Sequence, residues 1–213
     1  MVLDTVVTGY IQENCYLVGS ADELFVIDPG DEAEKILHRI KDCNYQVKYI
    51  VLTHCHWDHI GAVAKIKEQT GAQLVLCKKE EEAYLDPYTN LMESFGAKVQ
   101  LPAPDVTVSE GDVLCSGEYD FNIIETPGHT EGGICLLCRD KLFSGDTLFR
   151  RGMGRVDLPT GNMKKIIESI RNKLFALPEE VQVYPGHGAP TTIGYEKKHN
   201  EVYEWERMSY ESM

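Results

Sequence analysis

The sequence predicts an α/β protein in which helices cover β-sheets in two similar halves. Short apolar or β-branched runs alternate with amphipathic segments in the first hundred residues, the middle is rich in strand-like runs, and the end returns to helix, strand and helix. The 213 residues, 43% of them hydrophobic and 26% charged, are enough for one compact domain with a full core. We therefore expect one domain over residues 1–213.

Strands and helices alternate in the expected first half. Residues 28–30, Asp-Pro-Gly, indicate a turn after the third apolar run, and Gly71 is typical of a helix end. The continuous apolar run 47–54 is expected to be buried on both faces. The expected elements are strands at 5–8, 15–18, 24–28, 47–54 and 72–77, helices at 32–42 and 59–71, and helical pieces at 78–96.

The second half is expected to be β-rich and then helical. Turns are indicated near Gly117 and residues 139–140, which would make hairpins of the surrounding strands. The expected elements are strands within 106–112, 113–128 and 133–146, a helix at 162–177, a strand at 181–185, a loop at 186–194 and a polar helix at 195–208.

Charge and composition exclude several classes of function. A net charge of −13 argues against a nucleic-acid partner, which requires a basic surface. The chain has no run of about eighteen apolar residues for a membrane span, and its N-terminus has no basic region typical of a signal peptide. The seven cysteines follow no disulfide-framework spacing. We expect a cytoplasmic protein with free thiols and no membrane partner; the sequence sets no oligomeric state.

Residues 53–59, THCHWDH, gather potential metal ligands in one short segment. His54 and His56 are two residues apart in an extended stretch, so both side chains can point the same way. Asp58 and His59 lie where the next helix begins, so their side chains can face a different point. The segment could therefore serve two neighbouring metal ions, with a solvated histidine-rich loop as the alternative.

Three later donors make the metal interpretation stronger than the loop interpretation. His129, Asp146 and His187 each follow a predicted strand in a glycine-containing turn, where ligands can converge while the strands hold their ends. Zinc usually takes about three or four protein ligands, so seven donors suit two metals with one bridging aspartate. Imidazole and carboxylate ligands suit zinc, and iron or manganese fit them too. We expect two divalent metal ions per chain.

The arrangement HxHxDH followed by separated His, Asp and His resembles the metallo-β-lactamase superfamily over essentially the whole chain. Residues 145–162, GDTLFRRGMGRVDLPTGN, and 184–200, YPGHGAPTTIGYEKKHN, are similar to its short glyoxalase II-like subgroup. The resemblance implies a four-layer αββα sandwich, with two mixed sheets flanked by helices. It also implies a ligand assignment, in which His54, His56 and His129 hold one metal, Asp58, His59 and His187 hold the second, and Asp146 bridges them.

The resemblance implies a dinuclear hydrolase acting on a small thioester, such as a hydroxyacyl-glutathione. A hydroxide held by the metals would attack the carbonyl, with Asp58 orienting it or taking its proton. A thiolate leaves readily because a cysteine-type thiol has a pKa of about 8.5. Full-length glyoxalase II proteins carry a basic C-terminal extension for glutathione, whereas this chain ends in an acidic segment. We expect no separate C-terminal glutathione-binding domain, and another low-molecular-weight thiol is an alternative carrier.

Other activities of the superfamily are weaker alternatives. A persulfide dioxygenase would use one iron on His54, His129 and Asp146, and the GMGRVD stretch resembles that family too, although YPGHG fits the hydrolases better. A lactonase and a non-catalytic metal-binding protein are further alternatives. A β-lactamase is disfavoured because dinuclear ones usually carry cysteine where this chain has Asp146, and an RNA-processing nuclease because of the negative charge.

Arg155 is the candidate substrate-binding residue outside the metal ligands. It lies on the loop after Asp146 and matches a basic position in related thioesterases, so we expect it to bind a substrate carboxylate. Asp157 is expected to support this loop, and Arg150 and Arg151 to be solvated.

Several other side chains are expected to have structural or surface roles only. Cys55 should point away from the ligands beside it, and two cysteines three apart in a strand should face opposite sides, against a redox motif. The residues in this group are Cys55, Cys135, Cys138, His38, His199, Tyr184 and Tyr195.

Overall fold

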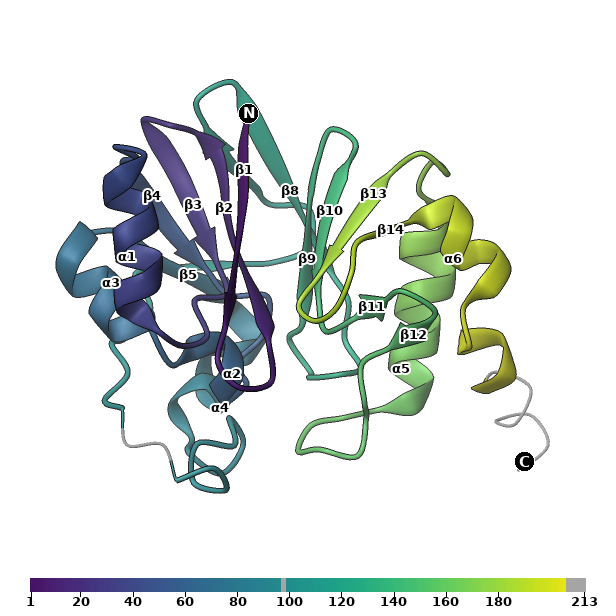
Figure 1. Cartoon of the computed structure of the whole chain (residues 1–213). Helices are drawn as coiled ribbons and strands as arrows, with labels where there is room; N and C mark the ends of the chain where they lie inside the picture. Colours follow the sequence, from purple (N-terminus) through teal and green to yellow (C-terminus); the bar gives the residue numbers. More distant parts are fainter. Residues whose placement is uncertain (97–98, 206–213) are drawn as a thin grey trace.

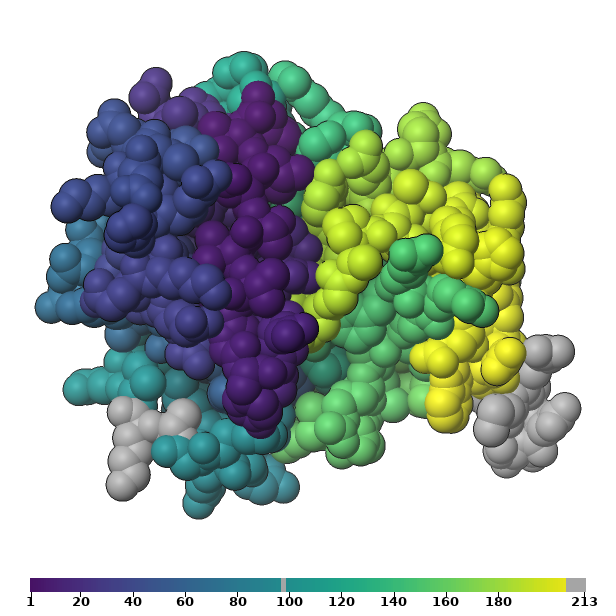
Figure 2. All heavy atoms as spheres, in the orientation of Figure 1, coloured from purple at the N-terminus to yellow at the C-terminus, as the bar shows by residue number. Residues whose placement is uncertain are grey.

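The computed structural model describes residues 1–96 and 99–205, and within these ranges a pair of six-stranded sheets lie face to face. Helices cover the outer face of each sheet, so the layers run helix, sheet, sheet, helix (Figure 1). In Figure 2 the N-terminal half, in purple and blue, meets the C-terminal half, in green and yellow, along the middle of the molecule. The expected αββα sandwich with two mixed sheets is confirmed.

The first sheet has the strand order β1-β2-β3-β4-β5-β6. Its first three strands are antiparallel neighbours, and β3 to β6 are parallel, with helices in the connections. The strands are β1 (Val2–Thr8), β2 (Glu13–Ser20), β3 (Glu23–Ile27), β4 (Val47–Val51), β5 (Gln73–Cys77) and β6 (Val106–Val108). The helices of this half are α1 (Ala33–Asp42), α2 (Trp57–Ile60), α3 (Val63–Thr70), the 3-10 turn η1 (Lys78–Glu80) and α4 (Glu81–Leu85).

The second sheet has the strand order β14-β13-β10-β9-β8-β7 and is mixed because β10 and β13 are parallel. Its strands are β7 (Val113–Ser116), β8 (Tyr119–Glu125), β9 (Ile134–Cys138), β10 (Lys141–Gly145), β13 (Gln182–Pro185) and β14 (Thr191–Thr192). The helical segments are α5 (Met163–Glu168), η2 (Ser169–Lys173), η3 (Leu174–Ala176) and α6 (Ile193–His199). A short hairpin, β11 (Leu148–Phe149) and β12 (Gly152–Met153), follows β10.

Three apolar clusters fill the spaces between the four layers. Successive residues of β3 show the pattern, since Leu24 and Val26 pack towards the helices while Phe25 and Ile27 pack between the sheets. Strand β4 is likewise buried on both faces near its end, as expected for a continuous apolar run. The two sheets thereby share one inner core, which fixes the edge where their loops meet.

The prediction of one continuous helix over 59–71 is wrong, because the structure has two separate helices there, α2 and α3. The break falls at Gly61 and Ala62, where the chain passes very close to the preceding loop. A Cβ at Gly61 would lie 2.4 Å from the backbone oxygen of Gly30, so only glycine fits. The short α2 therefore ends at Ile60, and it carries two of the predicted ligands.

The final helix expected over 195–208 is interrupted, because α6 ends at His199 and residues 202–205 are helical again. At the interruption, the side-chain amide of Asn200 donates to the backbone oxygens of Phe149 and Gly152 and to Glu196. These bonds hold the chain in an extended conformation at Asn200 and attach α6 to the β11–β12 hairpin. Residues 206–208 of the expected helix lie outside the described residues. Within the described ranges, no helix is both long and apolar enough for a membrane span.

Candidate metal centre

All seven predicted ligands lie in segments that follow strands, at one edge of the two sheets. The extended segment after β4 carries the first two histidines, and α2 carries the next aspartate and histidine. The remaining three follow β8, β10 and β13. The structure brings together His54, His56, Asp58, His59, His129, Asp146 and His187.

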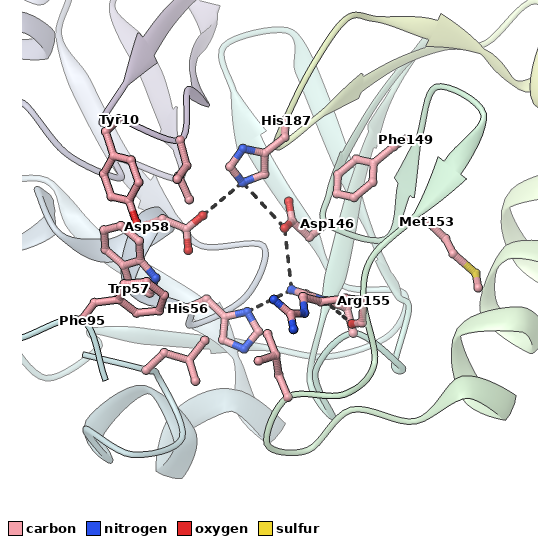
Figure 3. A pocket seen from close by; sticks show the side chains of 14 residues that line it. Tyr10, His56, Trp57, Asp58, Phe95, Asp146, Phe149, Met153, Arg155 and His187 are labelled. Carbon is pink, nitrogen blue, oxygen red and sulfur yellow. Dashed lines mark hydrogen bonds and ion pairs between the residues drawn. The ribbon is translucent and has the colours of Figure 1, made fainter. Parts of the chain in front are cut away.

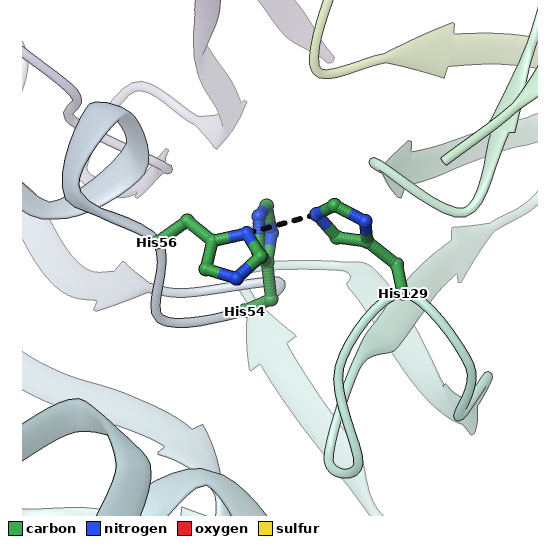
Figure 4. Close-up of side chains that lie close together, drawn as sticks. All are labelled: His54, His56 and His129. Carbon is green, nitrogen blue, oxygen red and sulfur yellow. Dashed lines mark hydrogen bonds between the residues drawn. The ribbon is translucent and has the colours of Figure 1, made fainter. Parts of the chain in front are cut away.

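The first cluster contains the three histidines expected to hold one metal. One ring nitrogen from each of His54, His56 and His129 lies within 4.8 Å of the others. The rings converge on one point (Figure 4), and the Nδ1 of His56 is 2.9 Å from the Nε2 of His129. This is the geometry of a three-histidine site.

The second cluster contains the residues expected to hold the other metal. Ligand atoms of Asp58, His59 and His187 also lie within 4.8 Å of one another. The Oδ2 of Asp58 is 3.0 Å from the Nε2 of His187 and 3.4 Å from the Nε2 of His59. The family resemblance implied this second set, and the structure places its ligand atoms close together.

Asp146 lies between the two clusters (Figure 3). Its Oδ2 is 3.7 Å from the Nε2 of His129 in the first cluster and 3.7 Å from the Nε2 of His187 in the second. Its Oδ1 is 3.4 Å from the Nε2 of His59. A carboxylate with neighbours in both clusters occupies the position that a bridging ligand needs.

The buried polar atoms at this centre fit divalent metal ions. Among the described residues, the Nε2 atoms of His54, His56 and His59 and the Oδ1 of Asp146 are buried without a hydrogen-bond partner. Buried polar atoms are nearly always paired, so this group of unpaired atoms fits the coordination of a cation. Nitrogen and carboxylate oxygen donors are the set that zinc, iron and manganese take.

At the first cluster and at Asp146, the electrostatics favour the metal-binding protonation states. Burial lowers the pKa of His54 well below its ordinary value and that of His56 to about 3, so both imidazoles are neutral. Burial alone would raise the pKa of Asp146, but His59 and His129 lower it below the usual range, so this group is a carboxylate. Neutral imidazole and carboxylate are the forms that bind a metal.

Asp28 orients the centre from behind, although its sequence position indicated only a turn. It is buried at the end of β3, and its carboxylate accepts from the backbone N–H of Thr53 at 2.7 Å and the Thr53 hydroxyl at 2.6 Å. Its Oδ2 is also 3.0 Å from the Nδ1 of His59. Asp28, His54 and His59 form a third cluster of possible ligands, but the Asp28 carboxylate is already bound by these groups. One sequence feature could have identified Asp28 as part of the site, namely its carboxylate at the end of the strand that precedes the ligand-bearing strand.

Backbone and hydroxyl groups orient two further histidines. The Nδ1 of His129 donates to the backbone oxygen of Arg155 at 2.7 Å, and the Nδ1 of His54 lies 3.1 Å from the Thr53 hydroxyl. Such outer contacts fix which ring nitrogen faces a metal.

A cavity of about 460 Å³ opens beside the centre and has apolar walls on both sides. Arg155 lies in its lining, whereas Arg150 and Arg151 do not. Arg155 donates from Nε and Nη2 to the two carboxylate oxygens of Asp157, each at 2.7 Å. This contact is consistent with the expectation that Asp157 supports the loop. Residues that line the cavity are Tyr10, Ile11, His56, Trp57, Asp58, Leu91, Phe95, His129, Asp146, Phe149, Met153, Arg155, Leu158 and His187.

The residues expected to have only structural or surface roles lie away from this cavity. Cys55 is buried in the core under the first sheet, where burial raises the pKa of its thiol. Cys135 and Cys138 belong to clusters on opposite faces of β9, so they form no redox pair. Tyr184 packs against Phe143, Tyr195 against His199, and His38 pairs with Asp42 on the surface.

Comparison with known proteins identifies the family. The family model of the metallo-β-lactamase superfamily matches residues 8–187. The chain therefore belongs to this superfamily of metal-dependent proteins, as the ligand pattern predicted.

Three relatives illustrate the range of similar proteins. The hydroxyacylglutathione hydrolase GloC of Haemophilus influenzae is 34% identical over 94% of this chain and 97% of its own. The crystal structure of the BLEG-1 B3 metallo-β-lactamase matches with a TM-score of 0.88 and 33% identity, covering 93% of this chain and 98% of that one. TTHA1623, solved in a di-iron-bound form, matches with a TM-score of 0.85 and 36% identity, covering 92% and 98%.

Proposed function

We propose that this protein is a dinuclear metal-dependent thioesterase of glyoxalase II type. The observation that carries the proposal is the position of Asp146 between two complete clusters of three ligands. The similarity to GloC, named a hydroxyacylglutathione hydrolase, supports the substrate class. Zinc is the metal we expect, and the di-iron form of TTHA1623 makes iron the first alternative. A cytoplasmic location, expected from the cysteine pattern, is included in the proposal.

The side chains at the centre have separate roles in this reaction. Divalent metals held by the two clusters would polarise the substrate carbonyl and lower the pKa of a bound water. Asp58 lines the cavity, and its contacts with His59 and His187 both run through Oδ2. Its Oδ1 can then accept a hydrogen bond from the attacking water and fix the direction of attack. The water oxygen adds to the carbonyl carbon, the C–S bond breaks, and the products are a carboxylic acid and a thiol.

A thioester suits this cavity better than a substrate with a poor leaving group. Outside the two clusters and Asp146, the ionisable side chains that line the cavity in the described residues are Tyr10 and Arg155. Neither is a carboxylic acid placed to protonate a strongly basic leaving group. A thiol with a pKa of about 8.5 leaves as thiolate without such help.

β-Lactam hydrolysis is a second candidate because of the similarity to the BLEG-1 B3 metallo-β-lactamase. The position of Asp146, where dinuclear β-lactamases usually carry cysteine, is the reason we place it second. A persulfide dioxygenase would need only His54, His129 and Asp146, which leaves the second cluster without a role.

One panel of assays on metal-reconstituted protein tests the proposal. The substrates are a hydroxyacyl thioester, a β-lactam, a lactone and a glutathione persulfide with oxygen uptake recorded. We expect thioester hydrolysis to exceed the other activities. Oxygen consumption with persulfide, or preferred opening of the β-lactam, would contradict the thioesterase and select the corresponding alternative.

A further inference from the structure

An aromatic wall, made of Tyr10, Trp57 and Phe95, forms one side of the cavity (Figure 3). The rings of Tyr10 and Trp57 are stacked with centroids 6.0 Å apart and an interplanar angle of 25°. Those of Trp57 and Phe95 are stacked at 4.5 Å and 23°. The three residues come from the β1–β2 turn, from α2 and from the segment after α4, so this stack is built from separate segments of the chain.

The wall is exposed although it is apolar. Tyr10 and Phe95 expose 76% and 52% of their surface, beside the cavity that contains the metal centre. Trp57 is half-buried, and its backbone N–H donates to the oxygen of Asn90 at 2.8 Å, which attaches it to the segment that carries Phe95. Fold stability does not require two aromatic rings in water, and an exposed apolar patch beside a reactive centre indicates a binding surface.

The opposite side of the cavity is apolar as well. Phe149 and Met153 face the wall across the metal centre (Figure 3). Within the described ranges of the chain, Arg155 is the only cationic side chain among the lining residues outside the ligands, and Asp157 neutralises it. One arginine that already pairs with an aspartate offers at most a weak contact to a thiol carrier with several carboxylates, whereas the apolar surface of the cavity is extensive.

Trp57 holds a fixed place relative to the reacting bond. Its chain neighbours His56 and Asp58 belong to the first and the second ligand cluster. A group that lies on Trp57 is therefore in the same cavity as the ligands of both clusters.

We propose that the substrate carries an aromatic ring next to the thioester carbonyl and that this ring stacks on the aromatic wall. This inference rests on the proposed thioesterase function and specifies its substrate class. The ring can belong to the acyl group or to the thiol, because the carbonyl carbon is bonded to both. Either origin gives the same contact with Trp57, so the experiment needs an arm for each.

Matched thioesters test the inference on the metal-loaded enzyme. Mandeloyl and lactoyl esters of N-acetylcysteamine differ only in a phenyl or a methyl group on the acyl side, and the lactoyl ester of benzyl thiol places the ring on the thiol side. We expect kcat/KM to rise about 10-fold or more for one of the two aryl substrates relative to the lactoyl ester, mainly through KM. The arm that shows the preference identifies the side on which the ring lies.

Substitutions in the aromatic wall test whether the wall causes the preference for aryl substrates. Phe95→Ala and Tyr10→Ala should each reduce the aryl-to-methyl ratio of kcat/KM about 3-fold or more. Tyr88→Ala removes another exposed aromatic ring, outside the cavity lining, and should leave the ratio unchanged. Equal ratios in all three variants would overturn the assignment of the wall.

Ligand binding gives a readout that does not depend on turnover. The sequence has two tryptophans, so a Trp205→Phe background leaves Trp57 as the only fluorophore of this kind. If the ring lies on the acyl side, mandelate should change the Trp57 emission with saturation at concentrations about 10-fold lower than lactate requires; if it lies on the thiol side, benzyl thiol should do so relative to N-acetylcysteamine. If thioesters are hydrolysed without an aryl preference, the inference is wrong and the thioesterase stands. If mandelate binds at Trp57 but no thioester is hydrolysed, the aromatic site stands and the thioesterase is wrong.

Discussion

Replacing Asp28 by asparagine should weaken one metal site selectively. In the wild type, Oδ2 of Asp28 faces the Nδ1 of His59 at 3.0 Å. When the ring is neutral, as metal binding requires, its proton therefore stays on Nδ1 and its Nε2 is free to bind a metal in the second cluster. An asparagine has nearly the same shape. Its amide nitrogen in the Oδ2 position would donate to Nδ1 and move the ring proton to Nε2, the atom that should bind the metal.

The alternative orientation of that amide is no better. Turning the amide oxygen towards His59 would place its NH₂ group against the backbone N–H of Thr53, which donates to Asp28 at 2.7 Å. Two donors would then face each other in a buried position. Loss of an orienting contact of this kind costs about 10- to 100-fold in metal affinity.

The assay is a chelator competition titration that resolves two metal-binding steps. In Asp28→Asn one step should weaken by about 10- to 100-fold while the other changes much less. Asp22→Asn makes the same chemical change at an exposed position and should leave both steps as in the wild type. If the affinities of both metal-binding steps were unchanged in Asp28→Asn, or if both were weakened equally, the idea that Asp28 acts through His59 would be refuted.

Three further substitutions test the bridge, the substrate contact and the packing under the ligands. Asp146→Asn should weaken both metal sites and remove most activity, and a variant that keeps two metals and normal turnover would refute the bridge. Arg155→Ala should raise KM about 5-fold for a carboxylate-bearing thioester and leave a neutral thioester unaffected, whereas equal losses would assign Arg155 to loop structure. Gly30→Ala should lower the free energy of unfolding by about 3 kcal/mol or more, because a Cβ there would lie 1.8 Å from the backbone oxygen of Asp58. Gly71→Ala, with a φ of +70° but no neighbour within 4 Å, should cost only about 1 kcal/mol in denaturant unfolding, and similar losses in both variants would contradict the close contact.

The sequence was most informative where spacing alone determines geometry. His54 and His56 lie on one side of an extended segment, and the start of α2 turns Asp58 and His59 towards a second point, so two clusters could be predicted from seven residues. The continuous apolar run 47–54 likewise predicted a strand buried on both faces, which β4 is near its end. Helical periodicity failed at Gly61, because the contact that separates α2 from α3 is with a loop about thirty residues earlier.

The contacts that the sequence did not reveal are those between distant segments. Asp28 meets His59 only because β3 and β4 are neighbours in the sheet. The aromatic wall likewise needs three loops in one place, and nothing in the local pattern around Tyr10 or Phe95 indicates a partner. Arg155 was found as a candidate, but its bidentate contact with Asp157 depends on the loop conformation.

The central claim is that each chain holds two metal ions joined by Asp146. An anomalous difference map from a crystal of metal-reconstituted protein tests it most directly. We expect two peaks per chain, one among His54, His56 and His129 and one among Asp58, His59 and His187, with Asp146 in contact with both. A single peak, with nothing at the second cluster after reconstitution with excess metal, would contradict the dinuclear centre.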